Sequence, residues 1–171
     1  MSRDEAQRTA RVTPEMLESL PITYQAVIPE SYIDGMGHMN VMWYTHLFAH
    51  ALGGAWKLLG MTREYFVARQ AGSFALKQLF SYLNEVRVGE HVTLRSRLIA
   101  RSEKRLHMLH FMVKDEARMM AATDEVVVAH IDMRVRRSSP FGPEVAAALD
   151  RLLAEHSALA WPPPVSGALH P

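Results

Sequence analysis

The chain has 171 residues, of which 49% are hydrophobic and 22% charged, as is typical of one soluble globular domain with short extensions. A formal net charge of +1 provides no strong field for nucleic acid or anionic membranes, and the absence of Cys excludes disulfides, thiolate catalysis and Cys-based metal sites. Because no secretory leader and no membrane span is evident, we expect a cytoplasmic protein without nucleic-acid or membrane partners.

Three segments are expected along the chain. They are a polar leader over 1–20, a folded domain over 21–140, and a C-terminal helix with a Pro-rich tail over 141–171. The folded domain begins with "ITYQAVI" (22–28), a short strand candidate that ends at Pro29.

After a turn over 29–39, the segment "NVMWYTHLFAHALGGAWKLLG" (40–60) contains no Pro and no acidic residue. Its apolar positions cover nearly the whole circumference, which predicts a helix buried on most sides. Asn40 is a suitable N-cap and Gly60 a suitable C-terminal stop. The pair Gly53–Gly54 costs about 1 kcal/mol per glycine relative to Ala, and close backbone packing would explain its presence.

The period then changes to that of strands joined by short turns, which predicts an antiparallel meander. The strand candidates are 73–83, 91–100, 105–115 and 124–136. The last of them places Val127, Ala129, Ile131, Met133 and Val135 on one face, and His130, Asp132, Arg134 and Arg136 on the other. This order predicts an α+β fold in which one antiparallel sheet wraps around one long central helix.

The turn before the helix, "YIDGMGHMNVMWY", concentrates the polar chemistry of the sequence. Backbone amides at a helix N-terminus can hold a carbonyl oxygen as it becomes an oxyanion. Asp34 lies six residues before Asn40, so a tight turn can fold its carboxylate over the helix end, to attack a carbonyl or deprotonate water. His38 can orient the water or protonate the leaving group, and Asn40 can cap the helix or donate to the oxyanion. The alternative is ordinary cap and turn chemistry.

The spacing Asp-x-x-Gly-His-Met-Asn, followed by Tyr44, resembles the signature of hot-dog-fold acyl-CoA thioesterases, and more narrowly the 4-hydroxybenzoyl-CoA thioesterase family. The resemblance covers about residues 22–138, and "GHMNVMWY" is similar to small bacterial thioesterases, some associated with carnitine or betaine metabolism. It implies a hot-dog fold and hydrolysis of an acyl-CoA to free acid and CoA, with no metal and no cofactor other than the CoA of the substrate. Asp34 would be the nucleophile or general base, and the amides of Val41 and Met42 would polarise the thioester carbonyl.

Two departures from the family pattern concern a second acid. Many members carry an acid in the helix just after the position of Phe48, where this chain has Ala49 and then His50. Related plant enzymes have Asn midway between the Asp and the His, where this chain has Met36. Asp34 is therefore the main catalytic candidate.

A metal site is the competing reading of "HLFAH", which sets His46 and His50 one helical turn apart. Zinc hydrolases of this pattern need Glu after the first His, but the chain has Leu47 and offers no evident third ligand. We expect packed or pocket-lining histidines and no metal.

Basic residues gather between 87 and 105, and "RSEKR" at a strand-to-strand turn is the candidate for the phosphates of CoA. The alternative is a solvated charged hairpin. The residues expected to bind substrate or CoA are Tyr44, Phe74, Gln78, Arg101, Ser102, Lys104 and Arg105.

Two other functions stay open: a hot-dog hydratase or dehydratase, and a non-catalytic acyl-CoA-binding sensor. The acyl group is equally open among aryl, medium-chain and small cationic acids. The segment 73–83 is apolar on parts of both faces and lacks Pro, so an unguarded sheet edge predicts a homodimer or homotetramer.

Overall fold

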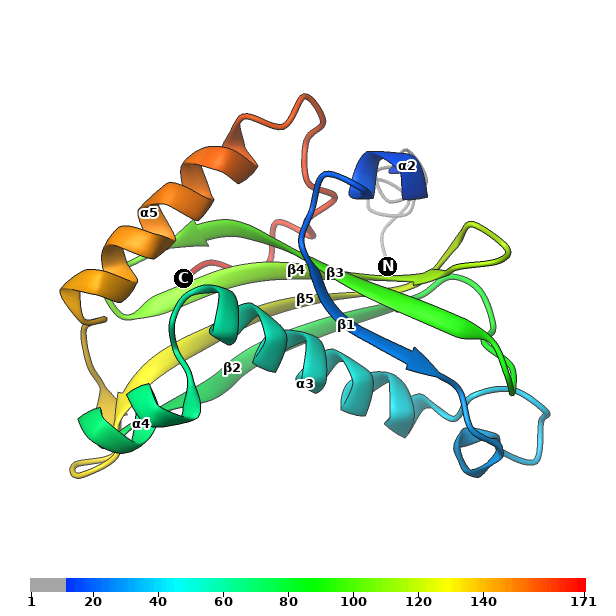
Figure 1. The fold of residues 1–171 in the computed structure, drawn as a ribbon, viewed down its shortest axis with the longest axis horizontal. Helices are drawn as coiled ribbons and strands as arrows, with labels where there is room; N and C mark the ends of the chain where they lie inside the picture. The colour runs from blue at the N-terminus through cyan, green and yellow to red at the C-terminus, as the bar shows by residue number, and fades with distance from the viewer. Residues whose placement is uncertain (1–11) are drawn as a thin grey trace.

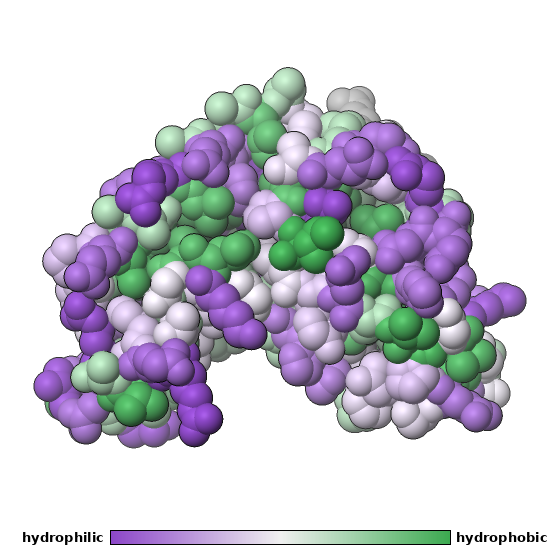
Figure 2. Space-filling view, viewed as in Figure 1, coloured by the Kyte–Doolittle hydropathy of each residue, from purple (hydrophilic) through white to green (hydrophobic). Residues whose placement is uncertain are grey.

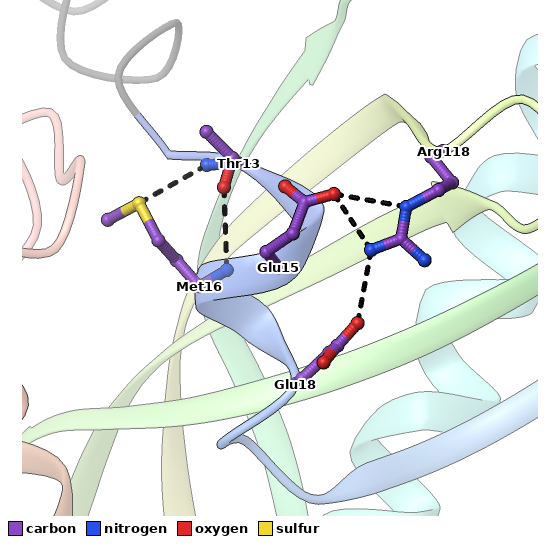
Figure 3. Close-up of polar contacts among 5 residues, drawn as sticks. All are labelled: Thr13, Glu15, Met16, Glu18 and Arg118. Atoms are coloured by element: carbon purple, nitrogen blue, oxygen red, sulfur yellow. Dashed lines mark hydrogen bonds and ion pairs between the residues drawn. The ribbon is translucent and has the colours of Figure 1, made fainter.

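The computed structural model in Figure 1 describes residues 12–171, so most of the predicted leader over 1–20 lies outside the described residues. The described part of the leader forms α2 (Pro14–Leu17), which Thr13 caps. Arg118, in the turn after β4, donates to Glu15 at 2.7 Å and to Glu18 at 3.1 Å (Figure 3). These ion pairs attach α2 to the sheet.

Six strands form one antiparallel sheet, in which the order β1-β3-β4-β5-β2 leaves β1 and β2 at the two ends. The short β6 lies off this order and pairs with β5. The strands are β1 (Ile22–Val27), β2 (Ala71–Tyr82), β3 (His91–Arg101), β4 (Arg105–Lys114), β5 (Met119–Asp132) and β6 (Arg137–Ser138). The antiparallel sheet predicted from the sequence is confirmed.

The long helix α3 (Val41–Leu58) lies along one face of the sheet, as Figure 1 shows. Its inward side buries Leu47, Phe48 and Ala51 among residues of the strands. His46 and His50 are exposed on the outward side, so the expectation of burial on most sides was wrong for this chain. Imidazole rings at these positions tolerate contact with water. Because the rest of the segment is so hydrophobic, the sequence does not indicate which side of the helix is exposed.

The helix approaches β1 unusually closely at Gly54. A Cβ atom at that position would lie 1.9 Å from the carbonyl oxygen of Thr23, whereas a Cβ at Gly53 would meet nothing within 4 Å. The close packing inferred from the glycine pair is therefore confirmed for Gly54.

The last long strand differs from its predicted limits of 124–136. It begins at Met119 and ends at Asp132, and residues 133–136 form the turn to β6. Arg136 has a φ of +53° in that turn, and Val135, expected on the apolar face of the strand, is 64% exposed. The apolar alternation continues past the strand, so the sequence alone does not mark its end.

Two helices complete the described chain. The short α4 (Arg63–Arg69) was not predicted, whereas α5 (Pro143–Ser157) agrees with the predicted C-terminal helix. Beyond the first residue of β1, which pairs with Arg95, α5 lies along the edge of β3, and the backbone amide of Leu98 donates to Nδ1 of His156 at 2.8 Å. Burial lowers the pKa of His156 to about 4, which keeps this acceptor neutral.

The C-terminal tail and α2 cover the sheet face opposite α3. The guanidinium of Arg97 stacks over the ring of Trp161 at 4.2 Å, and the amide of Ser166 donates to Glu125 at 2.7 Å. Leu17 and Leu20 pack there against Leu109, Phe111 and Val113. Because both faces are covered, β4 and β5 are buried almost throughout.

Candidate active site

The turn before α3 is closed by its own backbone. The amide of Asp34 donates to the carbonyl of His38 at 3.0 Å, and the amide of Gly37 donates back to the carbonyl of Asp34 at 3.0 Å. Gly37 has a φ of +83°, a conformation that glycine adopts without strain. The amide of Asn40 donates to Tyr32 at 2.9 Å and fixes the turn to the start of the helix.

The carboxylate of Asp34 is oriented by two donors. Its Oδ1 accepts from the amide of Met36 at 2.9 Å, and its Oδ2 accepts from Nδ2 of Asn40 at 3.3 Å. Nδ1 of His38 lies 4.0 Å from Oδ1, and the side chains of Asp34 and His38 are 26% and 33% exposed. The structure thus brings Asp34, His38 and Asn40 together, and leaves the carboxylate open to a ligand.

The first amides of α3 are used unequally. Oδ1 of Asn40 caps the helix by accepting from the amide of Met42 at 3.0 Å, and the carbonyl of Asn40 accepts from Trp43 at 3.0 Å. Within residues 12–171, the amide of Val41 has no hydrogen-bond acceptor. Of the two amides predicted to polarise a carbonyl, that of Val41 is therefore the one available to a ligand.

A pocket of about 350 Å³ opens beside this carboxylate, between the N-terminus of α3 and the end of β2. The rings of Tyr44 and Tyr82 meet edge to face in its wall, with centroids 5.1 Å apart. The pocket is lined by Asp34, His38, Met39, Asn40, Val41, Tyr44, Tyr82, Leu83, Asn84 and Glu85. Among the residues that the structure describes, no Lys or Arg lines it. The pocket therefore combines two carboxyl groups with two phenol rings.

Both tyrosines stay neutral in this wall. Burial raises the pKa of Tyr44, and burial together with the nearby charge of Asp124 raises the pKa of Tyr82. Their hydroxyl groups remain donors.

The residues at the end of β2 were missed by sequence reasoning. Tyr82, Asn84 and Glu85 reach the pocket because β2 ends where the turn before α3 begins, although they follow that turn by more than forty residues. The stretch "SYLNEV" shows no signal that would have singled them out.

Within one chain, the predicted CoA residues do not meet Asp34. The strand β3 starts near the turn and ends at Arg101, so its length separates the two sites by about 33 Å. Figure 1 shows the two regions at opposite ends of the sheet. Arg101 is paired with Asp150 of α5 at 2.7 Å, and Oγ of Ser102 accepts from the amides of Lys104 and Arg105.

The two residues predicted on β2 also lie away from this pocket. Gln78 donates to Asp124 at 3.2 Å, and the guanidinium of Arg136 lies 5.5 Å from the ring centre of Phe74. Of the predicted substrate residues, Tyr44 is the one that lines the pocket.

His46 and His50 belong to a series of rings on the outward side of α3. Their ring centroids are 4.6 Å apart, His50 stacks on Tyr24 at 4.7 Å, and Trp43 stacks on Tyr32 at 3.8 Å. Across residues 12–171, no group of three His, Cys, Asp or Glu side chains could hold a metal ion. Ring stacking accounts for the two histidines, and independence from metal stays a prediction.

The described chain contains no helix that is both long and apolar enough to cross a membrane.

Comparison with known proteins finds a family model, the Thioesterase-like superfamily, that matches residues 28–149. The betainyl-CoA thioesterase of Pseudomonas aeruginosa is 28% identical over 140 residues, which cover 82% of this chain and 88% of that protein. An L-carnitine dehydrogenase/betainyl-CoA thioesterase of Ruegeria pomeroyi is 24% identical over 148 residues, 86% of this chain but 30% of that longer protein.

Solved structures share the fold. A Staphylococcus aureus protein in complex with CoA has a TM-score of 0.79 at 20% identity, over 88% of this chain and 96% of that chain. A 1,4-dihydroxy-2-naphthoyl-CoA thioesterase from Synechocystis has a TM-score of 0.68 at 12% identity, over 77% of this chain and 96% of that chain. These likenesses confirm the predicted hot-dog fold.

Proposed function

Since the chain belongs to the Thioesterase-like superfamily, whose family model matches residues 28–149, we propose that it hydrolyses an acyl-CoA to the free acid and CoA. The observation that carries this proposal is the carboxylate of Asp34, which Met36 and Asn40 hold beside the N-terminus of α3. An oriented carboxylate next to a free helix amide supplies the two elements that thioester hydrolysis needs, a base or nucleophile and an oxyanion donor.

In the proposed reaction, the thioester carbonyl oxygen accepts a hydrogen bond from the amide of Val41. Asp34 then acts in one of two ways. As a general base it takes a proton from the attacking water, and as a nucleophile it forms an anhydride that water opens. Both routes release the CoA thiolate, which leaves with a proton, and His38 is placed to deliver it. Asn40 keeps the carboxylate in position and caps the helix.

The pocket favours a small cationic acyl group, such as the betainyl group in the names of the relatives. Tyr44 and Tyr82 line the pocket with aromatic rings, which attract a quaternary ammonium, and Asp34 and Glu85 add negative charge. In the part of the chain that the structure describes, no Lys or Arg side chain lines the pocket to oppose such a ligand.

For the CoA moiety, we propose the hairpin of Arg101, Ser102, Lys104 and Arg105 from a second copy of the chain. Pairing of two β2 strands about a two-fold axis would bring the far end of the partner's sheet toward Asp34, and with it Phe74 and Gln78. The reaction would need no metal and no cofactor beyond the CoA of its substrate.

The test is thiol release from betainyl-CoA by the wild type and by Asp34→Asn. Loss of the base or nucleophile is expected to lower kcat by ~10²-fold or more, with the fold unchanged by circular dichroism. Glu30→Gln serves as the control, because Glu30 is an exposed carboxylate of the same turn that does not line the pocket. Turnover of Asp34→Asn close to that of the wild type would refute the role of Asp34.

A further inference from the structure

Beneath α3, polar side chains from all five long strands form a belt across the sheet. Oγ1 of Thr23 on β1 lies 2.7 Å from Oγ of Ser96 on β3, which lies 2.6 Å from Nδ1 of His110 on β4. His110 pairs in register with Asp124 on β5, whose Oδ2 accepts from Gln78 on β2 at 3.2 Å. A polar belt under an apolar helix is costly unless every member finds a partner.

The belt is interrupted in its middle. Nε2 of His110 and Oδ1 of Asp124 are buried and have no hydrogen-bond partner within residues 12–171. Burial lowers the pKa of His110 to about 3, so its ring is neutral and does not balance a carboxylate. In the same described residues, no Lys, Arg or His nitrogen lies within 4.0 Å of Asp124, which is 1% exposed. Asp124 is thus a buried carboxyl without a compensating cation.

Asp124 lies directly behind the wall of the pocket. Tyr82 pairs with Ala122 and Phe80 with Asp124. Asp124 therefore lies two residues, or about 7 Å along the strand, from the position opposite Tyr82 and farther from the pocket. The rings of Phe80, the cross-strand neighbour of Asp124, and Tyr82, which lines the pocket, stack with their centroids 6.3 Å apart. The charge of Asp124 also raises the pKa of the Tyr82 phenol, which indicates that the two groups interact.

We propose that Asp124 is a specificity-determining residue, whose carboxylate makes the pocket prefer a cationic acyl group through the intervening Tyr82 ring. This inference rests on the proposed thioesterase function. A quaternary ammonium on the face of an aromatic ring is attracted by the ring, and a carboxylate behind that ring adds an attraction that the low dielectric of the interior strengthens. CoA, which is large and charged, must extend toward solvent, so the acyl group points inward, toward Tyr44 and Tyr82.

The other two carboxylates are less suited to this role. The oxygens of Asp34 are engaged by Met36 and Asn40, and that group is assigned to the reaction itself. Glu85 is 60% exposed and lies 3.5 Å from Arg87, so water and a cation both weaken its field.

The test uses two substrates of the same shape and different charge, betainyl-CoA and its neutral isostere 3,3-dimethylbutanoyl-CoA. We measure the ratio of their kcat/KM values, because a general disturbance of the fold lowers both and leaves the ratio unchanged. At pH 8, above the pKa of about 7 to which burial raises Asp124, the wild type is expected to favour betainyl-CoA, and Asp124→Asn is expected to lower the ratio about tenfold. Tyr82→Leu, which removes the ring, is expected to lower the same ratio.

The matched control is Glu125→Gln. Glu125 is the next residue, equally buried at 3% exposed, but it faces the opposite side of the sheet and is paired with His107 at 2.8 Å. Its substitution should leave the ratio of the two substrates unchanged. A ratio unchanged in both Asp124→Asn and Tyr82→Leu would overturn the inference while leaving the thioesterase function intact. Failure of the wild type to hydrolyse either CoA ester would instead reject the proposed function.

Discussion

At the scale of single residues, Asp34 and Asp124 lie near one pocket and have opposite surroundings. Asp34 is partly exposed and accepts two hydrogen bonds that orient it toward the helix N-terminus. Asp124 is buried, and burial raises its pKa to about 7 against an ordinary value of 3.8. The first carboxyl is ready to react, whereas the second is held at a cost to the stability of the fold.

That cost predicts a pH dependence of stability. The raised pKa means that the folded state binds a proton at Asp124 more tightly than the unfolded state does. The stabilisation that this proton gives to the folded state is therefore fully present below pH 3.8 and is lost as the pH rises toward 7. Asp124→Asn cannot ionise. Between pH 5 and pH 8, urea unfolding should show the wild type losing about 3 kcal/mol more stability than Asp124→Asn.

The buried His110 does not disturb this comparison. Its pKa, lowered to about 3, destabilises the fold as the pH falls below 6.5, but it does so equally in both proteins. If the two proteins show parallel changes in unfolding free energy with pH, Asp124 is not the buried acid that the structure indicates.

At the scale of elements, the contact between α3 and β1 depends on one glycine. Alanine at Gly54 would place its Cβ 1.9 Å from the Thr23 carbonyl oxygen, so the helix or the strand would have to move. We expect Gly54→Ala to lower the free energy of unfolding by about 2–3 kcal/mol, the cost of overpacking. The measurement is chemical denaturation at neutral pH.

Gly53→Ala is the matched control, one residue earlier in the same helix. Its added Cβ meets nothing within 4 Å, and alanine favours the helical state. It should raise the free energy of unfolding by about 0.5–1 kcal/mol. Destabilisation of similar size in both variants would mean that helix propensity, and not the approach of β1, determines the effect.

Elements were predictable where local sequence marks their ends. Asn40 caps α3 as predicted, because its side chain needs only the amide two residues on. The short α4 was missed, because its end depends on Gln70, which adopts a φ of +48° that its residue type does not indicate. The start of β5 was missed because Met120 is buried by contacts with α2 and the tail, which tertiary structure sets, and its end was missed because the apolar alternation continues past Asp132.

The residues of the candidate site likewise fall into those that the local sequence could indicate and those that it could not. Asp34, His38 and Asn40 lie within seven consecutive residues, so a single turn brings them together and the sequence could indicate them. Tyr82, Glu85 and Asp124 come from β2, the residues after it, and β5, and only the pairing register places them near the turn. No local pattern distinguishes them from ordinary strand residues.

At the scale of the whole molecule, β2 ends the sheet, and no strand of residues 12–171 pairs with its outer side. It is 12 residues long, and Leu76, at the bulge opposite β5, is 46% exposed. In Figure 2 the lower outline of the molecule is concave between α4, at lower left, and the turn before α3, at lower right. An uncovered edge strand of this length invites pairing with another strand.

The last prediction is that the active unit is a two-fold dimer formed through β2, alone or within a tetramer. Sedimentation at micromolar concentration should give twice or four times the mass of 19.3 kDa. Leu76→Asp sets like charges near one another across the two-fold axis, so it should dissociate the dimer and, because each site would need both copies, abolish most turnover. Ile22→Asp, on β1 at the other end of the sheet and exposed to the same 46% as Leu76, places the same charge away from this edge and should change neither mass nor rate. A monomeric wild type with full turnover would exclude both the pairing of β2 and a shared active site.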